Sequence, residues 1–359
     1  MPNHKLGLIG YGSIASGYHT DTLKRDDVDF ELTAVYDIRE SQRRLAAERG
    51  YTVFDNLRDF LDSRLFEFVT VAVPNNNHCK LACAAMRAGY HVMVEKPAAP
   101  TSREIEEMIA CAKIERRLFT VHHNRRWDRD FLIVKKALDD GILGKVHTIE
   151  SRIHPRNKEG GGVGGWRSFS DHGGGMLLDW GIHMLDQMLY LIKEPLVSVY
   201  ANIANHNESE VDDYSKLILT FESGLSATVE NATFTPLWLP RWYVAGDKGT
   251  LSMDFIGDRQ AKVRRIAESH TVTGTVTAYT LDTAYERQLT GRVIDRFEEY
   301  AYPVESEIPP QDWASLYKNL AAVLDNKEEL IVKPEEVHRC FKVIEAAVQS
   351  SKEKRSIQF

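Results

Sequence analysis

The sequence predicts a doubly wound α/β domain followed by an α+β domain. Strand and helix signals alternate as far as residue 122, and period-two segments separated by turns follow from Val146. A chain of 359 residues with 43% hydrophobic content is also long enough for two cores. We place the boundary between residues 123 and 124, which gives domains 1–123 and 124–359.

A parallel sheet is the economical topology for the first domain, because short βα alternation with right-handed crossovers leaves few other arrangements. Thr101 and Glu104 form a capping box that opens a helix ending near residue 115. Other helices are expected up to residue 24 and at 40–49 and 77–88. The expected strands are 6–9, 32–36, 51–54, 68–73, 91–94 and 119–122.

The second domain shows the pattern of antiparallel hairpins. Segments 214–221 and 225–229 flank the turn Glu222-Ser223-Gly224. Strands at 241–244, 250–255 and 271–279 would extend this sheet, and helices are expected to begin at Ile294, Trp313 and Pro334. One broad sheet face would then be available for pairing with another subunit.

Composition and charge argue against several partners. The net charge is −7 and no lysine and arginine cluster follows a nucleic-acid backbone, so we expect no nucleic-acid partner. No apolar run is long enough to cross a bilayer, and the first residues lack the regions of a signal peptide. We therefore expect a soluble, cytoplasmic protein without a membrane partner.

A glycine-rich turn follows the first strand and opens a helix, the context that a dinucleotide site requires. The first glycine permits a tight turn, the second lets the backbone approach a pyrophosphate, and the helix N-terminus offers free amides. An ordinary βα turn is the alternative. The residues are Gly10, Tyr11, Gly12, Ser13, Ile14 and Ala15, with alanine at the third position, where a small side chain suffices.

Asp37 ends the second strand, where a carboxylate can accept hydrogen bonds from the adenosine ribose hydroxyls and would repel a 2′-phosphate. This favours NAD over NADP as the cofactor. Arg39 lies two residues later and could instead neutralise a phosphate, so NADP stays open.

Two further strand ends carry unusual residues, and ligands of such sheets collect at the carboxyl ends of strands. Pro74, Asn75 and His78 follow the strand at 68–73. Glu95, Lys96 and Pro97 follow the strand at 91–94, and the proline stiffens the turn from which Lys96 projects. The Lys96 ammonium could hydrogen-bond a reacting oxygen; a plain surface lysine is the alternative.

In the second domain, Asp179, His183 and Asp186 interrupt an apolar helix at spacings of four and three, which places them on one face. Oxidation of a carbinol needs a base for the hydroxyl proton, and His183 suits that role with Asp179 orienting or polarising it. The alternatives are a solvated helix stripe and a metal site, although no other ligand set is evident and we expect no metal.

Together these features resemble the Gfo/Idh/MocA family of glucose-fructose oxidoreductases, inositol dehydrogenases and their relatives, over nearly the whole chain. The matching segments occur in the family's order: the turn at 10–15, Val73-Pro74-Asn75 with His78, Glu95-Lys96-Pro97, Asn124-Arg125-Arg126-Trp127, and Asp179-Trp180-Gly181-Ile182-His183.

The resemblance implies an N-terminal Rossmann domain, a C-terminal domain with a large, mostly antiparallel sheet used in oligomerisation, as a homodimer or homotetramer, and an active site between them. It makes Lys96, Asp179 and His183 the catalytic residues, with His183 as acid/base. Asn124 and Arg125 become candidate substrate-binding residues. So do Trp166 and Arg167 in the glycine-rich segment, where an aromatic face could cover a sugar, with core packing as the alternative.

The predicted reaction moves a hydride between NAD and a secondary carbinol of a sugar, sugar derivative or polyol. One alternative is redox-neutral glycoside cleavage, in which transient oxidation allows elimination before the hydride returns. Another is a regulator that binds the dinucleotide without catalysis. Lys96, Asp179 and His183 argue against the regulator, because a pure sensor needs no proton acceptor.

Overall fold

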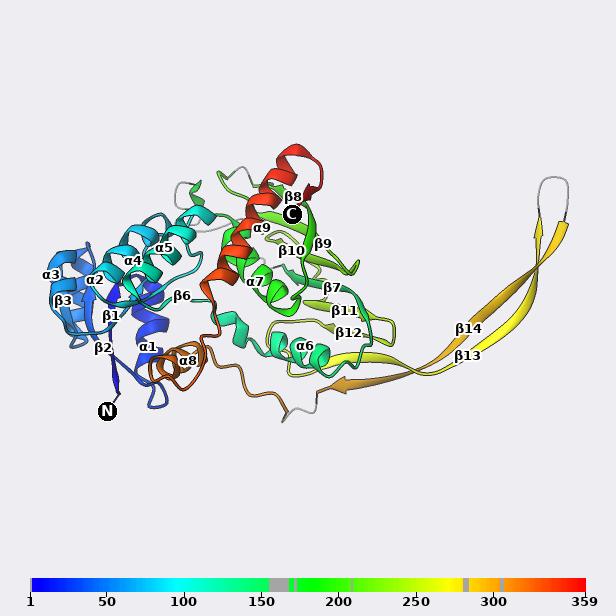
Figure 1. The fold of residues 1–359 in the computed structure, drawn as a ribbon, viewed down its shortest axis with the longest axis horizontal. Helices are drawn as coiled ribbons and strands as arrows, with labels where there is room; N and C mark the ends of the chain where they lie inside the picture. The colour runs from blue at the N-terminus through cyan, green and yellow to red at the C-terminus, as the bar shows by residue number, and fades with distance from the viewer. Residues whose placement is uncertain (1, 155–167, 171–172, 208, 280–283, 304–306) are drawn as a thin grey trace.

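Two β-sheets organise the protein in the computed structural model (Figure 1), which describes residues 2–154, 168–170, 173–207, 209–279, 284–303 and 307–359. The first sheet has six parallel strands in the order β3-β2-β1-β4-β5-β6. Its strands are β1 (His4–Ile9), β2 (Phe30–Tyr36), β3 (Thr52–Phe54), β4 (Phe68–Val71), β5 (His91–Val94) and β6 (Phe119–Val121). The order reverses between β1 and β4, where such sheets bind ligands.

Helices connect these strands as the parallel topology requires. They are the π-helix η1 (Ala15–His19), α1 (Thr20–Leu23), α2 (Glu40–Glu48), α3 (Leu57–Asp62), the 3-10 turn η2 (Asn75–Asn77), α4 (His78–Arg87) and α5 (Ser102–Glu115). The Thr101 hydroxyl accepts a hydrogen bond from the Glu104 amide, so the predicted cap of α5 is confirmed. The predicted Rossmann arrangement is confirmed as well.

The second sheet has nine strands in the order β14-β13-β12-β11-β7-β10-β9-β8-β15. Only β7 and β10 run parallel; the other pairs are antiparallel, as predicted. The strands are β7 (Val146–Ile153), β8 (Leu196–Ala204), β9 (Tyr214–Phe221), β10 (Ser226–Ala232), β11 (Trp242–Gly246), β12 (Gly249–Met253), β13 (Ala261–Tyr279), β14 (Ala284–Tyr302) and β15 (Ile357–Gln358).

The C-terminal helix ties the two sheets together, because α9 (Pro334–Glu353) contacts α5, α7 and β8 (Figure 1). One large cluster of buried hydrophobic side chains runs through both halves of the molecule. The boundary at residue 123 stays a prediction. The other helical elements are η3 (Asn124–Trp127), α6 (Arg129–Asp139), the π-helix η6 (Leu177–Gly181), α7 (Ile182–Leu191) and α8 (Ser315–Leu324).

The helix predicted to begin at Ile294 is wrong. Residue 294 lies within β14 and pairs with His270 of β13, and this hairpin projects from the body of the molecule (Figure 1). Its residues form backbone hydrogen bonds across the hairpin, and such long-range pairing overrides local helix preference.

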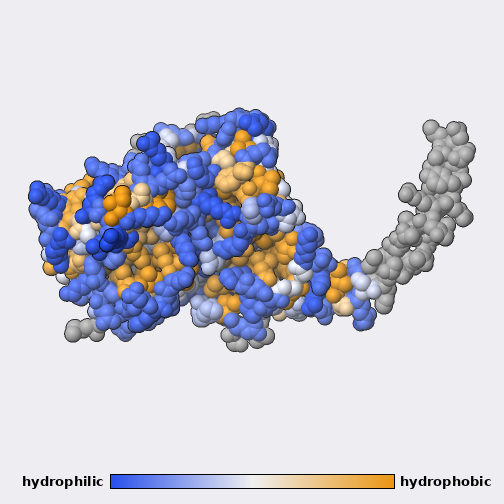
Figure 2. Space-filling model, viewed as in Figure 1, coloured by the Kyte–Doolittle hydropathy of each residue, from blue (hydrophilic) through white to orange (hydrophobic). Residues whose placement is uncertain are grey.

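The face shown in Figure 2 is mostly hydrophilic, and its apolar side chains form separate patches bounded by polar ones. Such a mixture is ordinary for a protein surface. Within the residues that the structure describes, no helix combines the length and apolar character needed to span a bilayer.

Candidate active site

The turn after β1 packs closely against the end of β4 at Gly10 and is open at Gly12. Gly10 has a φ of +91°, and a Cβ on it would lie 2.4 Å from the Ala72 carbonyl oxygen. Gly12 is half-buried, and a Cβ there would meet only the Arg39 guanidinium, at 3.7 Å. Ser13 and Ile14 are exposed beyond it. The turn is therefore open on the side that faces away from the sheet.

Asp37 is buried at the end of β2, and its carboxylate binds the turn. Its Oδ2 accepts a hydrogen bond from the Tyr11 amide at 2.7 Å, and its Oδ1 accepts one from the Arg39 amide at 2.8 Å. The Arg39 guanidinium folds back onto both oxygens, at 3.1 and 3.0 Å. These bonds to Arg39 outweigh burial and lower the pKa of Asp37 below its usual range. Arg39 must move before a ribose can reach this carboxylate.

Asn75 lies at the carboxyl end of β4 with its side chain buried. Neither its amide oxygen nor its amide nitrogen has a hydrogen-bond partner among the described residues. Gly173 sits directly over it, since a Cβ on Gly173 would lie 2.3 Å from Asn75 Nδ2. An unpaired buried amide is costly, so this group is suited to a ligand. Pro74 precedes it and begins the turn η2.

His78 is buried between two strand ends. Its ring nitrogens lie 2.8 Å from the Val73 carbonyl oxygen and 3.2 Å from the Ala98 carbonyl oxygen. Burial lowers its pKa, which favours a neutral ring that donates to one carbonyl. His78 thus holds the turn after β4 against the turn after β5.

Lys96 reaches from the first sheet to the second half of the chain. Its Nζ donates hydrogen bonds to Asp179 Oδ1 at 2.8 Å and to the Asp179 carbonyl oxygen at 3.0 Å. Both side chains are mostly buried, with 15% and 18% exposed. The partner aspartate lies in η6, a π-helical turn that leads into α7. Such turns inside helices are frequent at functional sites.

His183 is the buried histidine of this site, with only 4% of its surface exposed. Its Nδ1 has no hydrogen-bond partner among the described residues, and its ring lies edge-on to His123 at 5.8 Å. Burial is the main cause that lowers its pKa well below the usual value, and the Lys96 charge is the next. His183 is therefore neutral at neutral pH and able to accept a proton.

Arg125 forms one wall beside these residues. Its guanidinium stacks on the Trp180 ring at 4.2 Å and on the Trp313 ring at 5.2 Å, and it pairs with Asp128 at 3.0 Å. Asn124, one residue earlier, hydrogen-bonds the Tyr18 side chain. Trp166 and Arg167 lie outside the described residues.

The third residue of the predicted helix face has a different role. Asp186 forms a buried ion pair with Arg126, at 2.6 and 2.8 Å, and does not join Lys96. Spacing alone could not show this, because the partner is sixty residues away. Within the described part of the chain, the groups with metal-like spacing are His19-Glu95-His122 and His4-Asp29-Asp325, and neither contains Asp179 or His183.

Glu95 lies beneath Lys96 in a buried cluster that the sequence did not reveal. Its Oε1 lies 2.9 Å from His19 Nε2 and 2.7 Å from His122 Nδ1, and its Oε2 accepts the Lys96 amide at 3.0 Å. The Tyr317 hydroxyl, 2.7 Å from His19 Nδ1, completes the chain. The two histidines hold the pKa of Glu95 well below its usual range. The sequence signals are the positions of Glu95 and His122, each directly after a strand.

The chain belongs to the Gfo/Idh/MocA oxidoreductase family. Residues 4–123 match the family's NAD-binding Rossmann fold, and residues 131–252 match its C-terminal domain. The chain is 33% identical to an NAD-binding protein from Listeria innocua whose solved structure has a TM-score of 0.81, with 99% of this chain and 96% of that one covered.

Two curated enzymes are also similar. The scyllo-inositol 2-dehydrogenase (NADP(+)) IolW of Bacillus subtilis is 29% identical over 98% of this chain and 95% of its own length. The D-glucoside 3-dehydrogenase of Escherichia coli is 29% identical over 71% of this chain and 75% of its own length. The protein is thus an oxidoreductase with a nicotinamide-binding fold.

The residues present fit a nicotinamide dinucleotide. The turn at 10–14 is open for a pyrophosphate, Asp37 and Arg39 lie where the ribose would bind, and the unpaired amide of Asn75 lies at the carboxyl end of β4.

Proposed function

We propose that this protein is an NAD-dependent dehydrogenase that acts on a secondary carbinol of a sugar, sugar derivative or polyol. The observation that carries the proposal is the meeting of Lys96 and Asp179, 2.8 Å apart, beside the neutral, buried His183 at the carboxyl ends of the parallel strands. The names of the two similar dehydrogenases, which act on an inositol and a glucoside, support this substrate class.

Each residue has one role in this proposal. His183 accepts the hydroxyl proton as the carbinol becomes a ketone, and returns it in the reverse direction. The Lys96 ammonium donates a hydrogen bond to the same oxygen and stabilises the charge that develops there, while Asp179 fixes the direction of that ammonium. The chemistry that a bound, oxidised nicotinamide would supply here is that of a hydride acceptor for the carbinol carbon.

Other residues bind and orient. The turn at 10–14 and Asn75 hold the cofactor, with Pro74, His78 and Glu95 fixing the surrounding turns. Asp37 binds the ribose hydroxyls once Arg39 swings away, and the negative charge of Asp37 favours NAD over NADP because it repels a 2′-phosphate. Asn124 and Arg125 contact the substrate. The face of the second sheet opposite α7 and α9 pairs the subunits in a homodimer or homotetramer.

The test mixes purified protein and NAD with a panel of sugars, inositols and glycosides and follows the absorbance of reduced nicotinamide, with product analysis on the same samples. His183→Asn is expected to keep NAD binding by calorimetry and to lose roughly 10²–10⁴-fold in kcat. The control is His147→Asn, at an exposed position of β7. Unchanged turnover in His183→Asn would refute the assignment. A cleaved glycoside without reduced cofactor would favour the redox-neutral alternative.

A further inference from the structure

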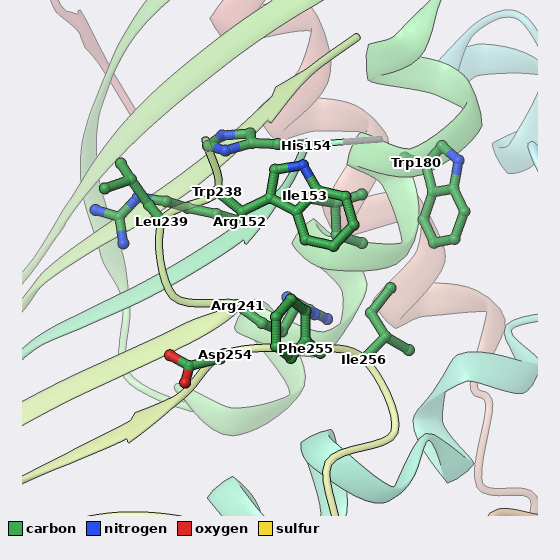
Figure 3. A pocket seen from close by; sticks show the side chains of 10 residues that line it. All are labelled: Arg152, Ile153, His154, Trp180, Trp238, Leu239, Arg241, Asp254, Phe255 and Ile256. Atoms are coloured by element: carbon green, nitrogen blue, oxygen red, sulfur yellow. The ribbon is translucent and has the colours of Figure 1, made fainter. Parts of the chain in front are cut away.

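A pocket of about 250 Å³ opens on the second half of the molecule, beside the candidate active site (Figure 3). The end of β7 forms one side, and the loops after β10 and β12 supply the others. Six apolar side chains line it: Ile153, Trp180, Trp238, Leu239, Phe255 and Ile256. We call it the aromatic pocket.

Two aromatic rings of this pocket are unusually exposed. Trp238 and Phe255 come from different loops and pack edge to face with ring centroids 5.5 Å apart, yet 51% and 50% of their surfaces are exposed. Leu239 beside them is 52% exposed. Aromatic rings release free energy when a ligand covers them, and they bind the apolar C–H face of a sugar or another ring.

Trp180 connects the aromatic pocket to the candidate catalytic residues. It lines the pocket, directly follows Asp179 in the chain, and its ring lies 6.4 Å from the ring of His183. The Arg125 guanidinium stacks on the same indole. Trp180 therefore borders both the aromatic pocket and the ring of the proposed base.

The charged groups of the pocket do not favour an anion. Arg152 pairs with Glu230 at 3.3 Å and also with Glu150. Arg241 is buried and pairs with Asp130 at 3.1 Å. Because carboxylates neutralise both guanidiniums, a phosphate or carboxylate substituent would gain little here.

Two polar side chains of the lining, His154 and Asp254, could fix the orientation of a ligand. His154 is only 9% exposed, and its Nδ1 has no hydrogen-bond partner among the described residues. The volume is close to the lower end of the range of roughly 300–1,000 Å³ found for small-molecule sites. The pocket thus suits one uncharged ring with a hydroxyl or ether oxygen.

We propose that the aromatic pocket binds the second ring of a glycoside, so that the substrate is a sugar with a ring attached, not a free monosaccharide or inositol. The ring stacks between Trp238 and Trp180 while the oxidised sugar lies at His183. This inference rests on the proposed function for the identity of the reacting sugar, but the pocket can be tested by binding alone.

The experiment measures the affinity of the NAD-loaded protein for methyl glucoside, phenyl glucoside and the disaccharide cellobiose by titration calorimetry, and their kcat/KM values in parallel. Phenyl glucoside or the disaccharide is expected to bind about tenfold more tightly than methyl glucoside. If phenyl glucoside binds better, the second ring of the substrate is aromatic; if the disaccharide binds better, the second ring is a sugar. In Trp238→Ala or Phe255→Ala, the affinity for the two-ring glycoside divided by the affinity for methyl glucoside should fall towards one.

Leu237→Ala is the matched control, because Leu237 is 81% exposed on the same loop but does not line the pocket. It should leave the ratio unchanged. Equal affinity for all three glycosides, or a preference that survives Trp238→Ala and Phe255→Ala, would overturn the proposal. So would loss of self-association in Trp238→Ala with an unchanged ratio, since a second copy would then cover this surface. If the two-ring glycosides bind more tightly but no hydride is transferred, the proposed function is refuted, while the proposal that the pocket binds a second ring is still supported.

Discussion

The ammonium of Lys96 lies 2.8 Å from Asp179 Oδ1, although the two residues are 83 positions apart and belong to different halves of the chain. The lysine follows the last residues of β5, and the aspartate lies in a π-helical turn before α7. This contact places a fixed positive charge beside the buried His183. The two halves therefore meet at the group proposed to hold the reacting oxygen.

The acid limb of the pH profile should report on His183. Burial and the charges of Lys96, Arg125, His123 and His122 lower its pKa well below the usual value of 6.5. A base with a lowered pKa stays unprotonated until the pH falls through that pKa. We therefore expect kcat/KM for oxidation to stay constant from neutral pH to below 6.5 and to fall only at lower pH.

The variant Lys96→Met distinguishes protonation of His183 from unfolding of the protein at low pH. In Lys96→Met, loss of the nearest positive charge should raise the pKa of His183 and move the acid limb of the residual activity to higher pH. Lys113→Met removes an exposed charge of α5 and should leave the limb in place. An acid limb at the same pH in wild type and Lys96→Met would contradict the assignment of His183 as the base.

The choice between NAD and NADP should depend on Arg39. Its guanidinium bonds to Asp37 at 3.0 and 3.1 Å, yet its side chain is 54% exposed and free to turn outwards. When the Arg39 guanidinium turns outwards, it can bind a 2′-phosphate. When Arg39 is replaced by alanine, the Asp37 carboxylate is left to accept hydrogen bonds from the ribose hydroxyls. Arg39→Ala should therefore raise the ratio of kcat/KM for NAD over NADP by about tenfold or more, the size of one charged hydrogen bond.

Arg44→Ala provides the control, because Arg44 pairs with Glu40 on the exposed surface of the same helix. In Arg44→Ala, the ratio of kcat/KM for NAD over NADP should equal that of wild type. An unchanged ratio in Arg39→Ala would contradict the prediction and would mean that Arg39 contacts only groups common to both cofactors, such as the adenine ring.

Local patterns predicted the first sheet well, because each βα unit carries its own signals. The cap at Thr101, for example, depends on the amide of Glu104, only three positions later. The hairpin of β13 and β14 was missed in part, since residues 294–302 form a strand only through pairing with residues 261–270. Local preference contains no such information.

In the candidate site, too, the sequence predicted the features that depend on local motifs but not those that depend on long-range contacts. Strand ends and motif order pointed to Lys96, Asp179 and His183, and the structure brings the first two into contact. The ion pair of Asp186 with Arg126 and the pocket ring pair Trp238 and Phe255 join segments that are distant in sequence. The spacing of Asp179, His183 and Asp186 along the sequence does not show which of them belong to the site and which forms an ion pair in the core.

The buried cluster around Glu95 should contribute strongly to stability. The ionised Glu95 carboxylate can only accept, so the neutral ring of His19 carries its proton on Nε2 and its Nδ1 accepts from the Tyr317 hydroxyl. The same carboxylate also binds His122 and the Lys96 amide. Glu95→Gln removes the charge from these bonds, and breaking a buried pair of this kind costs about 3 kcal/mol. Urea unfolding at pH 7 should show that loss in the free energy of unfolding.

The pH dependence of that loss has a definite sign. The pKa of Glu95 is lower in the folded protein than its ordinary value of 4.5, so its contribution is fully present above pH 4.5 and disappears as the pH falls through the lower folded value. The difference between wild type and Glu95→Gln should therefore not shrink between pH 8 and about 5. Glu107→Gln, on the exposed side of α5, is the control and should change stability little. A difference already shrinking between pH 8 and 6 would show that the carboxylate is protonated in the folded protein.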